Sequence, residues 1–582
     1  MFSKVLIANR GEIAVRIVRT LREMDIGSVA VYSEADRDAL FVQEADEAYR
    51  LGPPPAAQSY LDSEAILSIA RQAGAQAIHP GYGFLAENVP FAQAVIESGI
   101  VWIGPPVEAM RLMGDKVEAR RTVEPLGVPL VPGTPGPVTS LGEAIAFAAS
   151  VGYPVAVKAA GGGGGRGIRV VREEAEMADA LEGASREALA YFKNPEVYLE
   201  RYYANPRHVE IQVLGDTHGN LIHLGERDCS TQRRHQKLIE ESPGPAVDRA
   251  LRTRMGEAAL RAARSVSYHS AGTVEFLLNR EGEFYFLEMN TRIQVEHPVT
   301  ERVTGVDLIR EMILVAAGEP LTVRESFLDL DGHAIEVRIN AEDVRQGFRP
   351  TPTTITSYRE PGGPGVRLDS GVYAGFTIPS EYDSLMAKLT VWAPHREAAR
   401  RRALRALGEF RIEGPCSTIS LAKAILETPV FTEGEIGTTY VESHLDALLA
   451  AIPDEAPVVQ AEQDGRRREA ERTFDVEVNR KRFTVRLAEI IEAAGPATTQ
   501  KRRTTGKRAA QSNVLVSPMH GTVIAIRKAI GDSVAEGEPL FVIEAMKMEN
   551  EVAAHRGGTL AAIEVAIGET VETDQQLAII DD

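Results

Sequence analysis

Short apolar runs alternate with amphipathic segments over the first part of the chain. Val5–Ala8, Val29–Val31 and Ile100–Ile103 have the length and composition of buried strands, whereas Ile13–Met24 has the spacing of a helix. Strands that alternate with helices are typical of a parallel sheet covered on both faces. The pattern therefore predicts a doubly wound α/β domain over residues 1–113.

Two further regions follow before the composition changes. In a unit around residues 125–205 the apolar runs 155–158 and 168–171 predict strands, and a run of glycines separates them. From about residue 206 to residue 447 strand patterns come first and helical ones later, including the arginine-rich segment 396–410. The predicted class over both regions is α/β with α+β character.

Residues 448–512 are rich in Ala, Pro, Gln, Thr and charged residues and poor in large apolar ones. Such a composition is typical of a linker. Within it, the runs 474–478 and 482–486 alternate apolar and polar positions on either side of Asn479-Arg480-Lys481. This part predicts a small β-hairpin inside the linker.

The last segment, residues 513–582, contains an internal repeat. Gly521-Thr522-Val523 recurs 37 residues later as Gly558-Thr559-Leu560, and other positions repeat with the same offset. Two copies of a short-stranded unit predict a pseudo-symmetric, flattened β-barrel. Lys547 lies between the copies with a methionine on each side, so we expect a tight turn to present it.

Composition and charge exclude several classes of partner. The chain has 582 residues, of which 44% are hydrophobic and 25% charged, as in soluble globular proteins of several domains. Its net charge of −19 argues against nucleic acid or an acidic membrane surface as a partner. Two cysteines, Cys229 and Cys416, form no disulfide framework, and no apolar run is long enough to span a bilayer. We expect a cytoplasmic protein without a signal peptide, in which Cys229 is a structural thiol.

A predicted hairpin carries the most informative polar residues. Its two apolar strands would pair about a centre between Glu281 and Gly282, which places Glu275 opposite Glu288. Facing carboxylates repel each other unless a cation lies between them. Together with the side-chain carbonyl of Asn290 they form a set of hard oxygen ligands that suits Mg²⁺.

Two neighbouring patterns extend this site. Polar residues recur at every second position from 288 to 296, so they share one face if the chain is extended there. Arg227 and the run Arg233–Lys237 form a basic cluster that predicts an anion site.

The glycine run matches a dinucleotide fingerprint only formally. Gly162, Gly164 and Gly167 have the G-x-G-x-x-G spacing, but a strand pattern rather than a helix follows them. A glycine hairpin between two strands instead lets backbone N–H groups close over nucleotide phosphates. Lys158, just before the run, would then reach the phosphates as a point charge.

These features together resemble one enzyme family, the biotin-dependent acyl-CoA carboxylases. Residues 1–447 resemble its biotin carboxylase component, an ATP-grasp enzyme, and Ala545-Met546-Lys547-Met548 resembles the attachment turn of its biotinyl domain. The two methionines favour biotin over lipoate, whose domains usually carry Asp-Lys-Ala at this turn. The motifs that carry the carboxylase resemblance are Ile7–Ile13, His79–Phe84, Met113–Lys116, Glu226–Ser230, Gln232–Lys237, Glu288–Pro298 and Arg338–Glu342.

The resemblance implies a pre-ATP-grasp domain over residues 1–113, an ATP-grasp domain over 114–330 with a glycine-rich lid at about 131–204, a C-terminal carboxylase domain over 331–447 and a biotinyl carrier domain over 513–582. It also implies ATP, Mg²⁺ or Mn²⁺, and biotin bound covalently to Lys547. In such enzymes ATP phosphorylates bicarbonate to carboxyphosphate, and the carboxyl group then passes to biotin.

The resemblance assigns a role to each site residue. Glu296 would be the general base and Arg338 would stabilise the biotin enolate oxygen, with Lys237 and Arg292 completing the catalytic set. Bicarbonate would lie among Lys237, Arg292, Gln294 and Val295, and the metal ions would be held by Glu275, Glu288 and Asn290. The implied ATP-binding residues are Lys116, Lys158, Gly163, Gly164, Gly165, Arg166, Gly167, Glu200, Arg201, Tyr203, His208, Gln232, His235 and Leu277.

Several functional alternatives follow. A separate carboxyltransferase β subunit for acetyl-, propionyl- or longer acyl-CoA is expected, because the residues after 447 are too few for such a domain. Methylcrotonyl-CoA carboxylase and two-subunit pyruvate carboxylase are alternatives within the family. A different ATP-grasp ligase is a second hypothesis, which the sequence Glu544–Glu549 disfavours. A carrier protein whose N-terminal part has lost catalysis is a third, which the complete set of site residues from Lys116 to Arg338 disfavours. Other expected partners are a biotin-protein ligase and further copies of the chain in a hetero-oligomeric holoenzyme.

Overall fold

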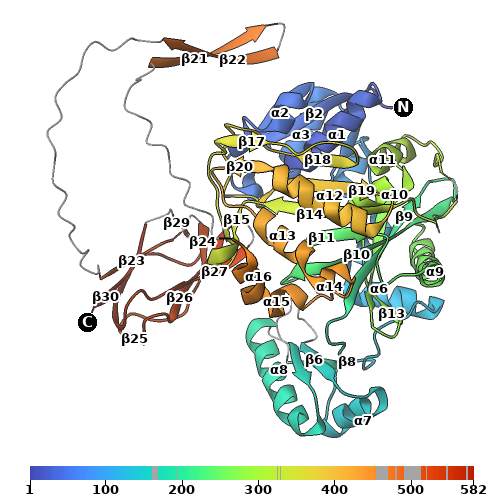
Figure 1. Cartoon of the computed structure of the whole chain (residues 1–582), viewed down its shortest axis with the longest axis vertical. Helices are drawn as coiled ribbons and strands as arrows, with labels where there is room; N and C mark the ends of the chain where they lie inside the picture. Colours follow the sequence, from blue (N-terminus) through green and yellow to red (C-terminus); the bar gives the residue numbers. More distant parts are fainter. Residues whose placement is uncertain are drawn as a thin grey trace.

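The computed structural model describes residues 1–159, 168–192, 195–323, 325–327, 329–453, 470–478, 481–489, 513–518, 521–545, 548–571 and 575–581. A large body contains the N-terminal unit and a long sheet, a small lobe projects from it, and a C-terminal unit is made of strands (Figure 1). Within the described ranges, no helix has both the length and the apolarity needed to cross a membrane.

The N-terminal unit is a five-stranded parallel sheet with the order β3-β2-β1-β4-β5. Val5 and Ile7 of β1 face one side and pack in the same core as helix α1, while Leu6 and Ala8 face the other side and pack in the core of α3 and α4. The predicted doubly wound unit is therefore confirmed. Its elements are β1 Lys4–Ile7, α1 Gly11–Glu23, β2 Gly27–Ser33, α2 Leu40–Glu44, β3 Glu47–Gly52, α3 Ser63–Ala73, β4 Ala77–His79, α4 Val89–Glu97, β5 Val101–Trp102 and α5 Val107–Gly114. Helix α6 (Lys116–Val123) follows and packs in a different core.

The projecting lobe has a sheet and a core of its own. Strand β6 (Val155–Ala159) pairs antiparallel with β7 (Ile168–Val171) and with β8 (Val197–Arg201). Helices α7 (Leu141–Val151) and α8 (Met177–Phe192) cover this sheet and share its apolar core. The lobe is therefore a packing unit separate from the body (Figure 1).

An eight-stranded sheet with the order β13-β12-β9-β10-β11-β14-β19-β18 forms the centre of the body. Strand β11 pairs with β14, so this sheet runs without a break across the boundary expected between residues 330 and 331. Its strands are β9 Arg207–Gly215, β10 Leu221–Arg233, β11 Gln236–Ser242, β12 Ser270–Leu278, β13 Phe284–Asn290, β14 His333–Asn340, β18 Val366–Ser370 and β19 Leu385–Ala393; the helices against it are α9 Arg249–Ser265, α10 His297–Thr304, α11 Leu308–Ala316 and α12 Arg396–Glu409.

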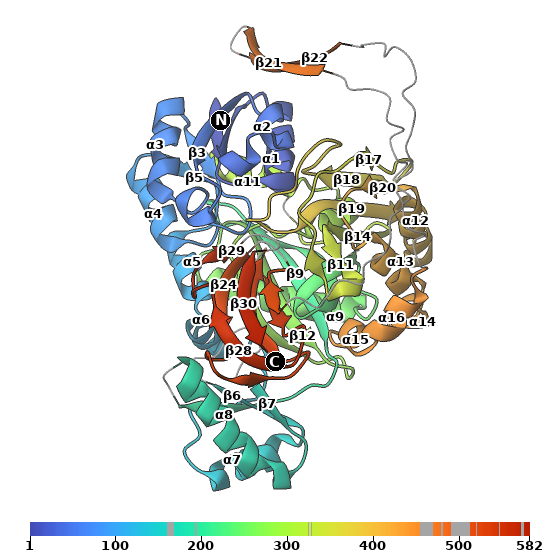
Figure 2. The same ribbon diagram turned by 90° about the vertical axis from the view of Figure 1, so that its left-hand side faces the viewer.

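Short elements complete the body beyond this sheet. Helix α16 continues past residue 447, where we expected the linker to begin, because Leu448 and Ile452 are buried in the core. The short elements are β15 Glu342–Asp343, β16 Arg349–Pro350, β17 Ser357–Arg359, β20 Arg411–Glu413, α13 Ile419–Glu427, α14 Pro429–Thr432, α15 Tyr440–Ser443 and α16 Leu445–Ala451. The hairpin predicted in the linker is present as β21 (Ala470–Val478) and β22 (Lys481–Glu489), which stand apart from the body in both views (Figure 2).

The C-terminal unit has the symmetry that the repeat predicts. Two four-stranded sheets, β23-β30-β28-β25 and β27-β26-β24-β29, enclose one apolar core. Strands β24, β25 and β26 begin 37 residues before β28, β29 and β30, so the repeat exchanges the two sheets. The strands are β23 Val514–Val516, β24 Gly521–Ile526, β25 Ser533–Val534, β26 Pro539–Ala545, β27 Met548–Ala553, β28 Gly558–Ile563, β29 Thr570–Val571 and β30 Gln576–Asp581.

Candidate active site

A cavity of about 1630 Å³ lies where the N-terminal unit, the lobe and the long sheet meet. Tyr82 lines it from the N-terminal unit, Lys158 from the lobe and Arg338 from the sheet. Residues 163–167 and Lys547 lie outside the described residues. All the other predicted site residues line the cavity: Lys116, Lys158, Glu200, Arg201, Tyr203, His208, Gln232, His235, Lys237, Glu275, Leu277, Glu288, Asn290, Arg292, Gln294, Val295, Glu296 and Arg338.

The hairpin of β12 and β13 places two glutamates opposite each other, as predicted. Glu275 pairs with Glu288, but nearer the turn Phe276 pairs with Phe286, so Leu287 forms a bulge. The register therefore changes at Leu287. The pair Glu275–Glu288 has the predicted centre, whereas the pairs nearer the turn are shifted by one residue. The two carboxylates and the Asn290 amide oxygen present only oxygen donors at the cavity, which fits Mg²⁺.

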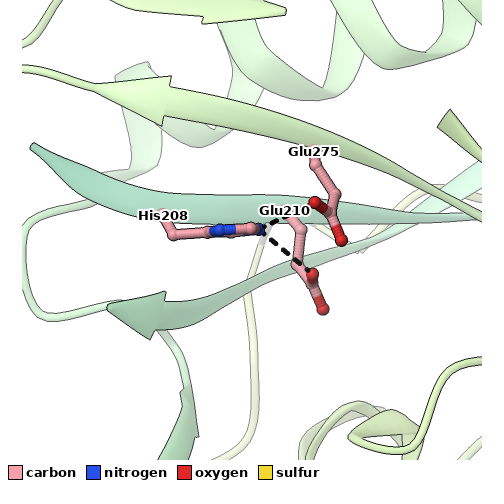
Figure 3. Close-up of side chains that lie close together, drawn as sticks. All are labelled: His208, Glu210 and Glu275. Carbon is pink, nitrogen blue, oxygen red and sulfur yellow. Dashed lines mark ion pairs between the residues drawn. The ribbon is translucent and has the colours of Figure 1, made fainter. Parts of the chain in front are cut away.

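The Glu275 carboxylate accepts hydrogen bonds from several directions. His208 Nε2 lies 3.0 Å from it and Lys237 Nζ 3.2 Å, and Figure 3 shows the imidazole of His208 pointing at Glu275 and Glu210. The amides of Asn290 and Gln294 each donate to it over 2.9 Å. Burial alone would raise the pKa of Glu275, but Lys237 and His208 hold that pKa well below its usual value. The group is therefore an anion at neutral pH.

Lys237 lies at the centre of three carboxylates. Its ammonium is 2.5 Å from Glu296, 2.7 Å from Glu210 and 3.2 Å from Glu275. Burial opposes the charge of Lys237, but Cys229, Glu210, Glu275 and Glu296 around it raise its pKa well above the usual value. Burial likewise opposes the charge of Glu296, but Lys237, Arg338 and Arg227 hold its pKa well below the usual value. Glu296 is thus ionised and can accept a proton, whereas Lys237 can only donate hydrogen bonds.

Arg338 bounds the same site from β14. Its Nε donates to Glu240 Oε1 over 2.6 Å and its Nη2 to Glu296 Oε2 over 3.0 Å. These two carboxylates fix the guanidinium plane at the cavity wall. Cys229, which we expected to be structural, is buried nearby, and burial raises the pKa of its thiol well above the usual value.

The expected extended face from Glu288 to Glu296 ends at Asn290, where β13 ends. Helix α10 begins at His297 with a proline in its first turn, so the chain must leave the extended conformation before it, and Glu296 has φ −82° and ψ 12°. Arg292 and Gln294 reach the site from this loop instead. Arg292 donates to the Glu87 carboxylate over 3.0 Å and to the side-chain oxygen Oδ1 of Asn290 over 2.8 Å.

The basic cluster predicted as one anion site is divided. Arg233 lies over the ring of Phe348 at 3.8 Å, and Arg234 is mostly exposed. His235 and Lys237 line the cavity. Arg227 is fully buried and donates within the protein, so it is a structural cation. Its acceptors are Glu210, Gln212, Thr273, Gln294 and Thr300.

Replacing Arg227 by methionine should lower the free energy of unfolding of the body by about 3–5 kcal/mol, because Glu210 loses one of its two buried cations and four other buried side chains lose their donor. Urea unfolding followed by tryptophan fluorescence measures this change, since Trp102 and Trp392 are the chain's only tryptophans and both lie in the body. The exposed Arg254→Met is the matched control. A loss no larger than that of the control would show that Arg227 does not hold the sheet.

The lobe side of the cavity carries a second group of charges. Glu200 accepts from Lys158 over 2.5 Å and from Arg120 over 2.7 Å. Lys116 begins α6 and lies 3.0 Å from Glu288. Because Lys158 on β6 pairs with Ile168 on β7, the glycine-rich segment is followed by a strand, as predicted, and not by the helix of a dinucleotide site.

Comparison with known protein families assigns every large part of the chain. Residues 1–110 match the family described as Biotin carboxylase, N-terminal domain, and residues 336–443 match Biotin carboxylase C-terminal domain. Residues 115–324 match Carbamoyl-phosphate synthase L chain, ATP binding domain. Residues 513–580 match the family described as Biotin-requiring enzyme.

Individual relatives agree with this assignment. A biotin carboxylase of Nostoc sp. is 54% identical over 441 residues, which are 76% of this chain and 99% of the relative. The chain belongs to the biotin carboxylase family. The biotin-dependent acyl-coenzyme A carboxylase alpha3 subunit of Mycobacterium leprae is 45% identical over 95% of this chain and 94% of its own. A pyruvate carboxylase subunit of Methanothermobacter thermautotrophicus is 52% identical over 78% and 93%.

Solved biotin carboxylase structures share the fold. The biotin carboxylase of Campylobacter jejuni superposes with a TM-score of 0.71 at 47% identity, covering 76% of this chain and 99% of that one. The biotin carboxylase domain of 2-oxoglutarate carboxylase from Hydrogenobacter thermophilus gives 0.70 at 47% identity, covering 77% and 99%. The predicted fold class and family are confirmed. The protein is an ATP-dependent ligase that uses ATP, Mg²⁺ and covalently bound biotin.

This biotin carboxylase carries its biotinyl domain on the same chain. Strands β26 and β27 pair antiparallel, with Ala545 opposite Met548. Lys547, the predicted attachment site, lies between these two residues in sequence and outside the described residues. The pairing places the start and the end of the motif side by side at one end of the domain.

Three carboxylates of the biotin carboxylase site were not predicted from the sequence. Glu210 lies between Arg227 and Lys237, Glu240 holds Arg338, and Glu87 holds Arg292. A signal for Glu210 was present, because His208, Glu210 and Gln212 alternate with apolar residues along β9 and so share one face. Glu87 has no such signal, because it reaches the site from the N-terminal unit.

Proposed function

We propose that the chain carboxylates biotin attached to Lys547 and supplies the carboxyl group to a separate carboxyltransferase subunit that uses an acyl-CoA. The alpha3 subunit of M. leprae supports this, because it matches both the carboxylase and the carrier parts. That relative is named a subunit, and this chain covers 94% of it. A biotin-protein ligase and further copies of the chain would complete the set of partners.

A two-subunit pyruvate carboxylase is the second candidate, because the pyruvate carboxylase subunit of M. thermautotrophicus is 52% identical. Its match covers 78% of this chain, against 95% for the alpha3 subunit, so it gives weaker support for the function of the biotinyl domain. Purification of the chain from its own cells with its bound transferase decides the matter. The complex should carboxylate acetyl-, propionyl- or longer acyl-CoA, and activity confined to pyruvate or methylcrotonyl-CoA would refute the acyl-CoA proposal.

ATP would bind between the lobe and the sheet. Lys116 and Lys158 supply positive charge for the phosphates, and closing the glycine segment would exclude water from a labile intermediate. Mg²⁺ would be held by Glu275, Glu288 and Asn290 and would offset the charge of the phosphate oxygens. The remaining ATP contacts would come from Glu200, Arg201, Tyr203, His208, Gln232, His235 and Leu277.

Bicarbonate would bind beside Lys237, with Arg292, Gln294 and the Val295 amide around it. Glu296, ionised and 2.5 Å from Lys237, would take the bicarbonate proton, so that the oxygen attacks the terminal phosphorus of ATP. ADP would leave as the terminal phosphoryl group passes to bicarbonate. The carboxyl group would then pass to the ureido nitrogen that biotin supplies, and the phosphate released would take the proton of that nitrogen. Arg338 would then stabilise the negative charge that develops on the acceptor.

Arg338→Ala should lower the turnover of biotin carboxylation about 100- to 1,000-fold, as loss of one donor to a developing anion does elsewhere. The KM for ATP should stay near its wild-type value, because Arg338 lies on β14 and contacts Glu240 and Glu296 rather than the lobe. Steady-state kinetics with free biotin measures both quantities. Arg338→Lys, which keeps the charge but not the planar fork, should lose less, and a large rise in the KM for ATP would place Arg338 in the nucleotide site instead.

A further inference from the structure

Lys388 is a fully buried lysine at the junction of three parts of the body. It lies on β19 with none of its side chain exposed. Its Nζ donates to the carbonyl of Val295 over 2.7 Å and lies 3.2 Å from Glu12 on α1. The long sheet, the N-terminal unit and the loop before α10 therefore meet at one ammonium group.

Glu12 connects Lys388 to the wall of the cavity. It accepts a hydrogen bond from the Tyr82 hydroxyl, and Tyr82 lines the cavity. Lys388 Nζ lies 5.8 Å from the centre of the Tyr82 ring. Asp369 faces Lys388 across the β18–β19 pair, so two carboxylates offset its buried charge.

The single backbone acceptor of Lys388 lies in the loop that carries the proposed bicarbonate site. Val295 is flanked by Gln294, which donates to Glu275, and by Glu296, which accepts from Lys237 and Arg338. This loop follows the end of β13, so no strand partner fixes its backbone. A peptide unit is planar, so holding the Val295 carbonyl also fixes the direction of the Glu296 amide and the start of its side chain.

We propose that Lys388 is a positioning residue for the carboxylation site, which holds the Val295–Glu296 peptide so that Glu296 faces bicarbonate. The proposal rests on the function proposed above. Lys388 acts through the backbone and touches neither substrate. Its effect should fall on the use of bicarbonate and not on the binding of ATP, whose proposed lysines lie on α6 and β6.

The test is bicarbonate-dependent ATP hydrolysis by the full chain with biotin present. Lys388→Met should lower kcat/KM for bicarbonate about 100-fold, the size of effect that a 1 Å displacement of a reacting group produces. The KM for ATP should remain near that of the wild type. Thr390→Val is the matched control, since Thr390 is buried two residues along the same strand and donates to Glu336 instead.

Lys388→Met leaves the buried Glu12 carboxyl without its cationic partner, so the double variant Glu12→Gln/Lys388→Met, which removes both members of the pair, guards against misfolding. It should show the same loss for bicarbonate. The proposal is overturned by a double variant with wild-type kcat/KM, by an equal loss in Thr390→Val, by an equal rise in the KM for ATP, or by failure of both Lys388 variants to fold. A wild-type chain without bicarbonate-dependent hydrolysis would refute the proposed function instead.

Discussion

Glu296→Gln should lower the rate of bicarbonate-dependent ATP hydrolysis about 100- to 10,000-fold, the range that a general base contributes. Glutamine has the same shape and can keep a hydrogen bond to Lys237, but it cannot take a proton. Lys237 and Arg338 lie 2.5 and 3.0 Å from Glu296 and keep its pKa well below the usual value, so the group is ionised and can accept a proton. Steady-state hydrolysis of ATP at saturating bicarbonate measures the loss.

The control for this variant is Glu342→Gln. Glu342 is also buried and lines the cavity, but its carboxylate accepts from Asn340 and Ser384 rather than from Lys237. Its loss of turnover should therefore be small. The KM for ATP of Glu296→Gln should be close to that of the wild type. Equal losses in both variants would show that Glu296 supports the cavity wall and is not the base.

Lys547→Ala should abolish biotin attachment, so a chain expressed with a biotin-protein ligase should lose all avidin binding. Carboxylation of free biotin should persist, because Lys547 lies in the carrier and the cavity belongs to the body. An avidin blot and an assay with free biotin measure the two effects. The expected result separates the catalytic part from the carrier part of one chain.

The chain offers a matched control for this variant. Residues 513–582 contain only two lysines, Lys547 and Lys528, and Lys528 forms an ion pair with Glu538 on the surface of the domain. Lys528→Ala should keep full avidin binding. Avidin binding by Lys547→Ala, or its loss in Lys528→Ala, would show that biotin is attached elsewhere.

Features encoded by local patterns could be predicted from the sequence. The facing pair Glu275 and Glu288 follows from strand alternation and the length of one hairpin, and the two sheets of the C-terminal unit follow from a repeat of 37 residues. Both features depend on a pattern that is visible within one hairpin or that recurs at a fixed spacing along the chain. The bulge at Leu287 was not predicted, because nothing in the strand pattern marks it.

Other parts of the site could not be predicted, because they depend on packing between distant segments. Glu87, Glu240 and Lys388 reach the site from three different parts of the chain, and no local spacing relates them to Glu296. The prediction that the basic cluster forms one anion site was wrong for a different reason. Arg227 is buried within the sheet, whereas Arg234 lies where β10 turns toward β11 and has a φ of 46°.

The most direct test is transfer of label from [¹⁴C]bicarbonate to the chain itself. Incubation of the biotinylated full-length protein with MgATP should give one acid-labile label per biotin, and the label should be absent without ATP, in Lys547→Ala and in Glu296→Gln. Such a pattern would place bicarbonate activation and the carboxyl acceptor on one polypeptide. A biotinylated wild-type chain that takes up no label, or a Lys547→Ala chain that retains it, would contradict the account.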